Sequence, residues 1–240
     1  MKRVVSRFHV GSEKGGRNTL TFGFVSDLHN GNYREWLSLL SGVDAILVTG
    51  DLLDRHRPGM GNACAFIHDA PEIAPVFLSL GNHETRSADG PEFRNALKKS
   101  RVTLLDDQFI DYKGIVIGGL SSRERESHKL APELIPDMKQ FVQRMSLAAG
   151  YKILLCHHPE YYDVCVRGQG IDLTLSGHAH GGQVELFGQG LYAPGQGLFP
   201  KYTHGFYDQG KLLVNRGITN STRAPRLWNP CELIILTVAY

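Results

Sequence analysis

Short runs of apolar, β-branched and aromatic residues recur along the chain, and their length is typical of strands rather than of membrane spans. The runs are Leu20–Val25, Ala45–Thr49, Pro75–Leu80, Ile115–Gly118, Lys152–Cys156, Ile171–Leu175, Leu212–Asn215 and Leu233–Val238. Helix-like stretches lie between several of them. These are Arg34–Leu40, Ala63–His68, Glu92–Lys99, Glu133–Ala149 and Glu160–Val166.

The order of these elements indicates an α/β fold. Strands and helices alternate in the first half of the chain, which predicts βαβ units and a mainly parallel sheet. In the second half, the turn residues of Asp111–Gly114 and Asp208–Gly210 lie between apolar runs and predict hairpins. A single mixed sheet, or two stacked sheets with helices outside, would account for both halves. Because no repeat, low-complexity tract or long linker divides the chain, we expect residues 1–240 to form a single domain.

Metal-binding residue types follow five of the predicted strands. The clusters are Asp27–His29, Asp51, Asn82–Glu84, His157–His158 and His178–His180. Asp and His are good ligands for Zn, Mn and Fe ions, and Asn offers a neutral oxygen. Ligands of open α/β sheets bind at the C-terminal ends of the strands. If the five strands are parallel, the clusters therefore converge on one edge.

Each cluster alone has an ordinary explanation. Asp51 could cap a helix, Asn82 and His83 could lie in a plain loop, and the glycine-rich sequence around His178 could be a metal-free turn. Five such clusters, each following its own strand, argue together for a metal centre. His157 and His158 cannot be separated in this way, because the strand before them is apolar on both faces.

The clusters resemble the motifs of the calcineurin-like metallophosphoesterases, which read DxH, GDxxD, GNH[DE], a later His and GHxH. The matching residues are Asp27–His29, Gly50–Asp54, Gly81–Glu84, His157 and Gly177–His180. The bacterial phosphodiesterase-like subgroup, which carries a GHTHGGQ loop, is similar here at GHAHGGQ. Its tail also resembles Lys201–Tyr207, Asn215–Gly217 and Asn229–Leu236. The resemblance implies an α/β fold of two stacked mixed β-sheets flanked by helices, a four-layer αββα sandwich.

The resemblance also implies two divalent metal ions, which would be Mn, Fe or Zn, and their ligands. The first ion would have the ligands Asp27, His29, Asp51 and His180. The second would have Asp51, Asn82, His157 and His178, so that Asp51 bridges the pair. The same resemblance selects His157 over His158, because the pattern is His-x-Pro.

Two further residues are expected to be catalytic. His83 follows a ligand and would protonate the leaving oxygen or stabilise the transition state. Glu84 would accept a hydrogen bond from His83 and orient it, although the family more often has Asp there. Asp54 would support the ligands without binding metal. His204, Arg216 and Arg223 either line the substrate pocket or lie on a solvated surface.

The function implied is hydrolysis of a phosphate ester by a hydroxide that bridges the two ions. Subgroup resemblance favours a phosphodiesterase acting on a small or lipid-linked substrate. A phosphomonoesterase or protein phosphatase would use the same metals. A catalytically silent scaffold of the same fold would have lost a ligand or the catalytic His, whereas every motif residue is present here.

Charge, cysteine content and the N-terminal sequence limit the partners and compartments that we expect. A net charge of +2, from 26 basic and 24 acidic residues, gives no overall attraction to nucleic acid and argues against a nuclease. The four cysteines form no CxxC pair, which predicts free thiols in a reduced compartment. The N-terminus lacks the apolar segment of a signal peptide. We expect a cytoplasmic protein, with membrane or envelope association as the alternative if a leader has been lost; the oligomeric state stays open.

Overall fold

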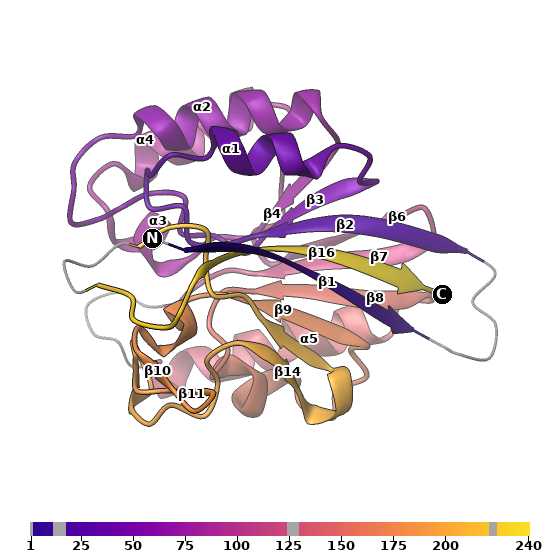
Figure 1. The fold of residues 1–240 in the computed structure, drawn as a ribbon. Coiled ribbons are helices and arrows are strands. Elements are labelled where there is room, and N and C mark those ends of the chain that lie inside the picture. The colour runs from indigo at the N-terminus through magenta and orange to yellow at the C-terminus, as the bar shows by residue number, and fades with distance from the viewer. Residues whose placement is uncertain (1, 12–17, 124–129, 221–224) are drawn as a thin grey trace.

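Two six-stranded mixed sheets stack face to face in the computed structural model, which describes residues 2–11, 18–123, 130–220 and 225–240 (Figure 1). The first sheet has the order β1 (Arg3–Gly11), β16 (Cys231–Ala239), β2 (Thr19–Val25), β3 (Ala45–Val48), β4 (Val76–Leu78) and β5 (Thr103–Leu104). The second has the order β14 (Gly205–Tyr207), β15 (Leu212–Val214), β9 (Leu173–Ser176), β8 (Tyr151–Cys156), β7 (Ile115–Leu120) and β6 (Gln108–Tyr112).

Helices cover the outer face of each sheet. The first sheet is covered by α1 (Arg34–Leu37), α2 (Gly61–Asp69) and α4 (Gly90–Lys99). The second is covered by α5 (Ile135–Ser146) and a π-helical turn at Tyr162–Val166. The short helix α3 (Asn82–Arg86) follows β4 after a short loop. The layers are therefore αββα, which confirms the expected fold class.

Short elements complete the chain. Single 3-10 turns lie at Ser38–Leu40, Ala70–Glu72, Pro132–Leu134, His180–Gly182 and Asp208–Gly210. Two small hairpins follow β9, formed by β10 (Glu185–Leu186) with β11 (Gln189–Gly190) and by β12 (Tyr192–Ala193) with β13 (Gly197–Leu198). No helix in the described ranges is both long and apolar enough to cross a membrane. All four cysteines fall within those ranges and are free thiols.

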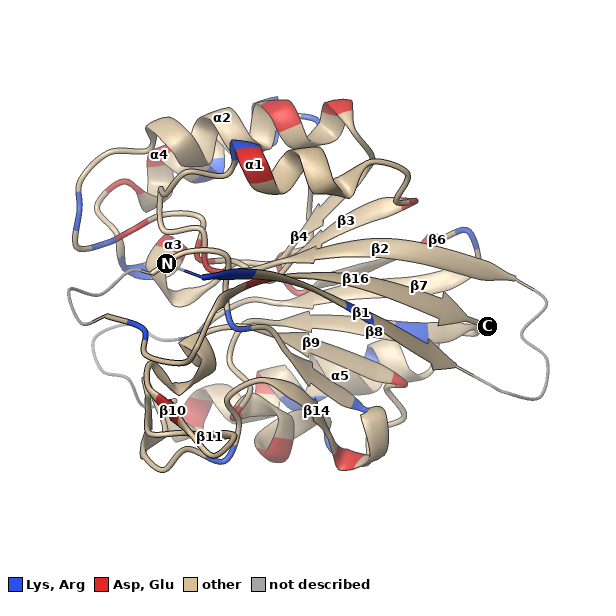
Figure 2. Cartoon of the chain, in the orientation of Figure 1, with Lys and Arg blue, Asp and Glu red and all other residues tan. Residues whose placement is uncertain are grey.

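The inner faces of the two sheets form the central core. Phe22, Phe24 and Leu47 of the first sheet pack in one cluster with Ile117 and Leu155 of the second, and all are fully buried. Each such side chain contributes roughly 1.5–3 kcal/mol through removal of its apolar surface from water. Figure 2 shows that charged residues lie mainly on the outer helices and loops, while the stacked strands carry few. The sheets are therefore held together by apolar contact.

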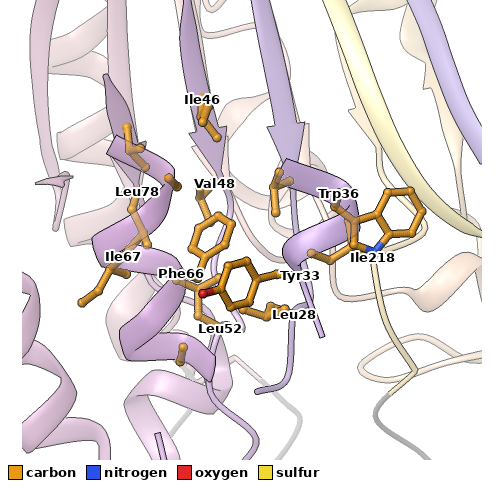
Figure 3. Close-up of a cluster of buried hydrophobic side chains, with 14 of the residues drawn as sticks. Leu28, Tyr33, Trp36, Ile46, Val48, Leu52, Phe66, Ile67, Leu78 and Ile218 are labelled. Carbon is orange, nitrogen blue, oxygen red and sulfur yellow. The ribbon is translucent and has the colours of Figure 1, made fainter. Parts of the chain in front are cut away.

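A second core lies between the first sheet and its helices (Figure 3). Trp36 of α1 is 3% exposed and packs in this cluster. The rings of Tyr33 and Phe66 meet edge to face at 5.6 Å, and the Tyr33 hydroxyl donates to Asp69 Oδ2 at 2.6 Å. The aromatic side chains thus fix both helices against the sheet.

The predicted elements agree with the structure in position, with some corrections. All eight predicted strands are present, and the two hairpins are found between β6 and β7 and between β14 and β15. The helix expected at Glu133–Ala149 is shorter and begins in a 3-10 turn, and the one expected at Glu160–Val166 is a π-helical turn. The strands β1 and β5, the helix α3 and the small hairpins after β9 were not predicted.

Candidate metal centre

The five polar clusters lie at the C-terminal ends of strands from both sheets. In the first sheet, β2, β3 and β4 are parallel and lead to Asp27, Asp51 and Asn82. In the second, β8 and β9 are parallel and lead to His157 and His178. Stacking of the sheets brings both sets together at one edge of the sandwich.

Asp27, His29 and His180 form the first group of ligand atoms, which all lie within 4.8 Å of one another. Asp27 Oδ1 is 3.6 Å from His29 Nε2 and 3.5 Å from His180 Nε2, and the two Nε2 atoms are 3.1 Å apart. Two ligand atoms bound to one ion at about 2.1 Å are separated by roughly 3–3.5 Å. The three side chains are therefore spaced as ligands of a single ion.

Asp51, His157 and His178 form a second group with the same spacing. The His157 Nδ1–H donates to Thr49 O at 2.9 Å, which leaves the lone pair of Nε2 for a ligand bond. Within the described part of the chain, Asn82 Oδ1, His157 Nε2 and His178 Nε2 are buried without a hydrogen-bond partner. Buried polar atoms are rarely left unsatisfied, and a cation between them would satisfy all three. The donor set therefore fits a metal.

Asp51 lies between the two groups. Its Oδ2 is 3.1 Å from His157 Nε2 and 3.9 Å from His29 Nε2. Its Oδ1 accepts a hydrogen bond from the backbone N–H of His83 at 2.8 Å. The carboxylate is thus fixed from one side and faces both groups with the other, as a bridging ligand must.

Five of the seven candidate ligands have a left-handed backbone. Their φ angles are 57° for Asp27, 49° for His29, 55° for Asp51, 66° for His178 and 48° for His180. Such conformations cost of order 1–3 kcal/mol each and cluster at functional sites. Backbone hydrogen bonds between the loops hold these conformations. Two of them run from Asp27 N to Gly50 O at 3.1 Å and from His29 N to Asp51 O at 2.9 Å.

Glycines allow the loops to approach this closely. A Cβ atom on Gly81 would lie 2.2 Å from Asp51 Oδ1, and one on Gly177 would lie 2.3 Å from Asp27 Oδ2. No larger residue fits at either position without moving a candidate ligand. The glycines of the GNH and GHAH motifs therefore leave room for the Asp51 and Asp27 carboxylates.

Glu84 does not orient His83, and this part of the sequence prediction is wrong. Its Oε2 accepts hydrogen bonds from the backbone N–H groups of Asp51 and Gly81, both at 2.8 Å, and its Oε1 accepts from Leu53 at 2.9 Å. Burial and the nearby Asp51 raise the pKa of Glu84. The longer side chain thus reaches the backbone and ties the loop after β3 to the loop after β4.

His83 is held by a backbone group instead. The N–H of Arg55 donates to His83 Nδ1 at 3.0 Å, so the neutral ring carries its proton on Nε2. That Nε2 lies 3.8 Å from Asp51 Oδ2, and the ring meets His29 edge to face at 4.4 Å. Burial lowers the pKa of His83 to about 3. The ring therefore presents an N–H donor to the centre.

The protonation states of the centre suit metal binding, which requires carboxylates and neutral imidazoles. Burial opposes the ionisation of Asp27, but His180 and His29 hold its pKa below the ordinary value. The pKa of Asp51 is likewise held down, chiefly by His157 and His83 against the effect of burial. Burial also lowers the pKa of His178 and of His180.

His157 is the exception, because the Asp51 carboxylate 3.1 Å from its Nε2 favours a second ring proton. Burial lowers its pKa, but the Asp51 carboxylate outweighs this and raises it to about 10. A divalent ion competes with that proton for both side chains. His158 has other partners, since its Nε2 lies 2.8 Å from Ser122 Oγ and its Nδ1 lies 3.3 Å from Glu160 Oε1. The structure thus brings His157 against the Asp51 carboxylate.

Two buried residues of the C-terminal segment support His180 and were missed in the sequence. Arg226 Nη2 donates to His180 Nδ1 at 2.7 Å and to Thr219 O at 2.5 Å. Asn229 Nδ2 donates to the backbone oxygen of His180 at 2.6 Å. Asn229 begins one of the tail segments noted above, but Arg226 belongs to no motif. A guanidinium only donates, so His180 Nδ1 is the acceptor and the proton of the neutral ring is on Nε2. Metal binding through Nε2 therefore requires loss of that proton or movement of Arg226.

The other arginines and His204 are engaged elsewhere. Arg216 pairs with Glu185 at 2.9 Å and with Glu232 at 3.7 Å, so it is neither solvated nor free for substrate. His204 Nε2 lies 3.8 Å from Glu185 Oε2. Arg223 lies outside the described residues. Asp54 Oδ1 accepts from the backbone N–H of His56 at 3.0 Å and lies 3.8 Å from His83 Nδ1, beside the candidate ligands.

Comparison with known proteins places this geometry in a family. An uncharacterized metallophosphoesterase of Campylobacter jejuni is 29% identical over 205 residues, which cover 83% of this chain and 51% of that protein. One from Helicobacter pylori strain J99 is 27% identical over 170 residues, covering 69% of this chain and 42% of that protein. The chain spans about half the length of these curated relatives.

A solved structure that is 11% identical shares the fold, with a TM-score of 0.52 over 67% of this chain and 84% of its own. The model of the calcineurin-like phosphoesterase family matches residues 20–182, which contain all of the candidate ligands. The chain belongs to the calcineurin-like phosphoesterase family.

Proposed function

We propose that this chain is a metal-dependent phosphoesterase whose centre holds two divalent ions. The first ion has the ligands Asp27, His29, Asp51 and His180, and the second has Asp51, Asn82, His157 and His178. The observation that carries the proposal is the position of Asp51 Oδ2, which faces His157 Nε2 at 3.1 Å and His29 Nε2 at 3.9 Å. When bound, two such ions supply the attacking hydroxide and offset charge on the phosphoryl oxygens.

The protein leaves the centre positively charged, which suits a phosphate. Asp27 and Asp51 contribute two negative charges, and the Asn and His ligands are neutral. The carboxylates thus offset only half of the charge of two divalent ions. Because the ligands are buried, this charge is weakly screened and attracts an anionic ester from the open side.

His83 stabilises the reacting phosphate as a neutral hydrogen-bond donor. Its Nδ1 accepts from the backbone N–H of Arg55, so its Nε2–H is directed into the centre near Asp51. A fixed donor aimed at developing negative charge stabilises the transition state without transferring a proton. Glu84 acts through Asp51, because its hydrogen bonds hold the backbone on both sides of the bridging ligand.

A phosphodiester is the proposed substrate class. A diester carries one negative charge and a monoester two, so a monoesterase needs more cationic groups at the phosphate. Arg216 is paired with two carboxylates, and Arg226 is bound to His180 and Thr219. Arg216 and Arg226, the arginines of the C-terminal segment that the structure describes, are therefore already engaged, which supports the diester over the monoester.

The surface beside the centre favours a substrate that carries an apolar group. Seven apolar side chains are exposed there and are named the rim surface: Leu186, Phe187, Tyr192, Leu198, Phe199, Leu227 and Trp228. Hydrogen bonds join the segments that carry these side chains to the metal-binding loop and to one another, from Leu191 N to Gly182 O and from Glu185 N to Leu227 O, both at 3.1 Å. Exposed apolar patches of this kind mark interaction sites. We therefore favour a lipid-linked phosphodiester over a small one.

The proposal is tested with metal-loaded protein and two chromogenic substrates. Rates on bis(4-nitrophenyl) phosphate and 4-nitrophenyl phosphate are compared after loading with Mn²⁺, Fe²⁺ or Zn²⁺. We expect a higher kcat/KM on the diester with at least one of these ions. A higher value on the monoester identifies a phosphomonoesterase, and metal binding without turnover of either ester identifies a silent scaffold.

A further inference from the structure

Glu160, which belongs to none of the motifs, places a carboxylate beside the second group of candidate ligands. It follows His157-His158-Pro159 after β8, and its Oε1 lies 3.9 Å from His178 Nε2. The ligand atoms of His158, Glu160 and His178 all lie within 4.8 Å of one another. Glu160 Oε2 is buried and has no hydrogen-bond partner among the described residues. A buried carboxylate oxygen without a donor calls for a cation.

His158 fixes the direction of this carboxylate. Its Nδ1 lies 3.3 Å from Glu160 Oε1, and because an ionised carboxylate only accepts, Nδ1 is the donor. The other nitrogen, Nε2, then accepts from the hydroxyl of Ser122 at 2.8 Å. The ring of His158 also stacks on Tyr161 at 4.4 Å. A fully buried histidine thus orients Glu160 toward His178, in the way that outer residues orient metal ligands.

Gly195 leaves the space that Glu160 occupies. A Cβ atom at this position would lie 2.3 Å from Glu160 Oε1 and 3.5 Å from His178 Nε2. The φ angle of Gly195 is +73°, which side chains rarely adopt. The loop between β12 and β13 therefore closes over the pair of side chains with the one residue that fits.

We propose that Glu160 is a further ligand of the ion that His178 holds. The inference rests on the proposed function. Two atoms bound to one ion at about 2.1 Å lie at most about 4.2 Å apart, so the 3.9 Å between Glu160 Oε1 and His178 Nε2 is compatible with a shared ion. A third carboxylate makes the second position richer in oxygen, which favours Mn²⁺ over Zn²⁺.

The added carboxylate also bears on the substrate. With Asp27, Asp51 and Glu160 ionised, the protein offsets three of the four charges of two divalent ions. Repulsion between Glu160 and the substrate then acts on two charges of a monoester and on one charge of a diester. Glu160 is thus a residue that selects the monoanionic diester.

Glu160→Gln tests the assignment, because the amide keeps the shape and removes the charge. The binding of Mn²⁺ to the full chain is measured by competition with a chelator of known affinity. We expect two ions in the wild-type protein, and a weakening of one of them by roughly 10–100-fold in the variant. Glu160→Asp keeps a carboxylate and should weaken that ion less. Glu92→Gln, at an exposed position on α4, serves as the control and should bind as wild type.

A second readout follows the ester preference at saturating Mn²⁺. The ratio of kcat/KM on bis(4-nitrophenyl) phosphate to kcat/KM on 4-nitrophenyl phosphate should fall about tenfold in Glu160→Gln, the effect of one nearby unit charge in a partly screened site. If Glu160→Gln binds two Mn²⁺ ions as tightly as the wild type, the assignment of Glu160 is wrong and the proposed function still stands. A wild-type protein that binds no Mn²⁺ overturns the proposed function as well.

Discussion

His157 Nε2 lies 3.1 Å from Asp51 Oδ2, although the two residues follow strands of different sheets. Asp51 follows β3 of the first sheet, and His157 follows β8 of the second. The apolar core between the sheets fixes the distance between these strands, so the core sets the geometry of the centre.

Asp51→Asn should lower the metal content of the protein. The amide keeps the shape but has one oxygen and no charge, so it cannot bridge two cations. We expect affinity for at least one ion to fall by more than about 10–100-fold, the usual loss for a supporting residue outside the ligand set. Metal content after dialysis is measured by elemental analysis. Asp137→Asn, at an exposed position on α5, should retain wild-type content.

His83→Ala should keep its metal and lose rate. Loss of a fixed donor to the reacting phosphate lowers kcat by roughly 10²–10³. Because the Nε2–H donates a hydrogen bond and not a proton, the loss should be equal for substrates with good and poor leaving groups. His83→Gln places an amide N–H near the same point and should recover part of the rate.

The comparison of leaving groups also decides between the two roles first expected for His83. Steady-state rates are measured for nitrophenyl and alkyl esters with metal content checked in each variant. A much greater loss on the alkyl ester would assign proton donation to His83 and contradict its role as a neutral hydrogen-bond donor. Loss of metal in His83→Ala would make it a ligand.

Glu84→Gln should destabilise the protein although Glu84 touches no candidate substrate. The carboxylate accepts three backbone hydrogen bonds, whereas an amide turns its NH₂ group toward at least one of these donors. We expect a loss of about 2–4 kcal/mol in the free energy of unfolding. Urea unfolding of the metal-free protein measures it, with Glu92→Gln as the control. Unchanged stability would show that these bonds contribute nothing net.

Phe187→Ser should weaken the hydrolysis of lipid-linked diesters only. The side chain is fully exposed on the turn between β10 and β11, so its removal leaves the core unchanged. We expect KM for an acyl-bearing phosphodiester to rise by about tenfold, from the loss of one apolar contact of roughly 1.5 kcal/mol. The rate on bis(4-nitrophenyl) phosphate should stay constant. Leu147→Ser, which is 82% exposed after α5, is the matched control, and equal effects of both would remove the rim surface from the account.

The strands and the candidate ligands were predictable from sequence for a common reason. A fully buried strand is a continuous apolar run, so the polar residue that ends it stands out, as Asp51 does after Ala45–Val48. The edge strand β1 was missed because its residues are exposed or half-buried and because its partner β16 lies at the other end of the chain. No local pattern records such a pairing.

Side-chain partners were less predictable than side-chain positions. Sequence placed Glu84 next to His83 along the chain, but the reach of its side chain directs it to three backbone donors. Arg226 and Glu160 carry no motif of their own, and only the fold brings them against His180 and His178. Their environment depends on segments distant in sequence, which periodicity and spacing do not encode.

The central claim is a pair of ions shared through Asp51, and a stoichiometric titration tests it most directly. Metal-free protein is titrated with Mn²⁺ while the initial rate on bis(4-nitrophenyl) phosphate is recorded. The rate should rise until two equivalents per chain have been added and then stay constant. A plateau at one equivalent, or a rate that is independent of added metal, would contradict the account.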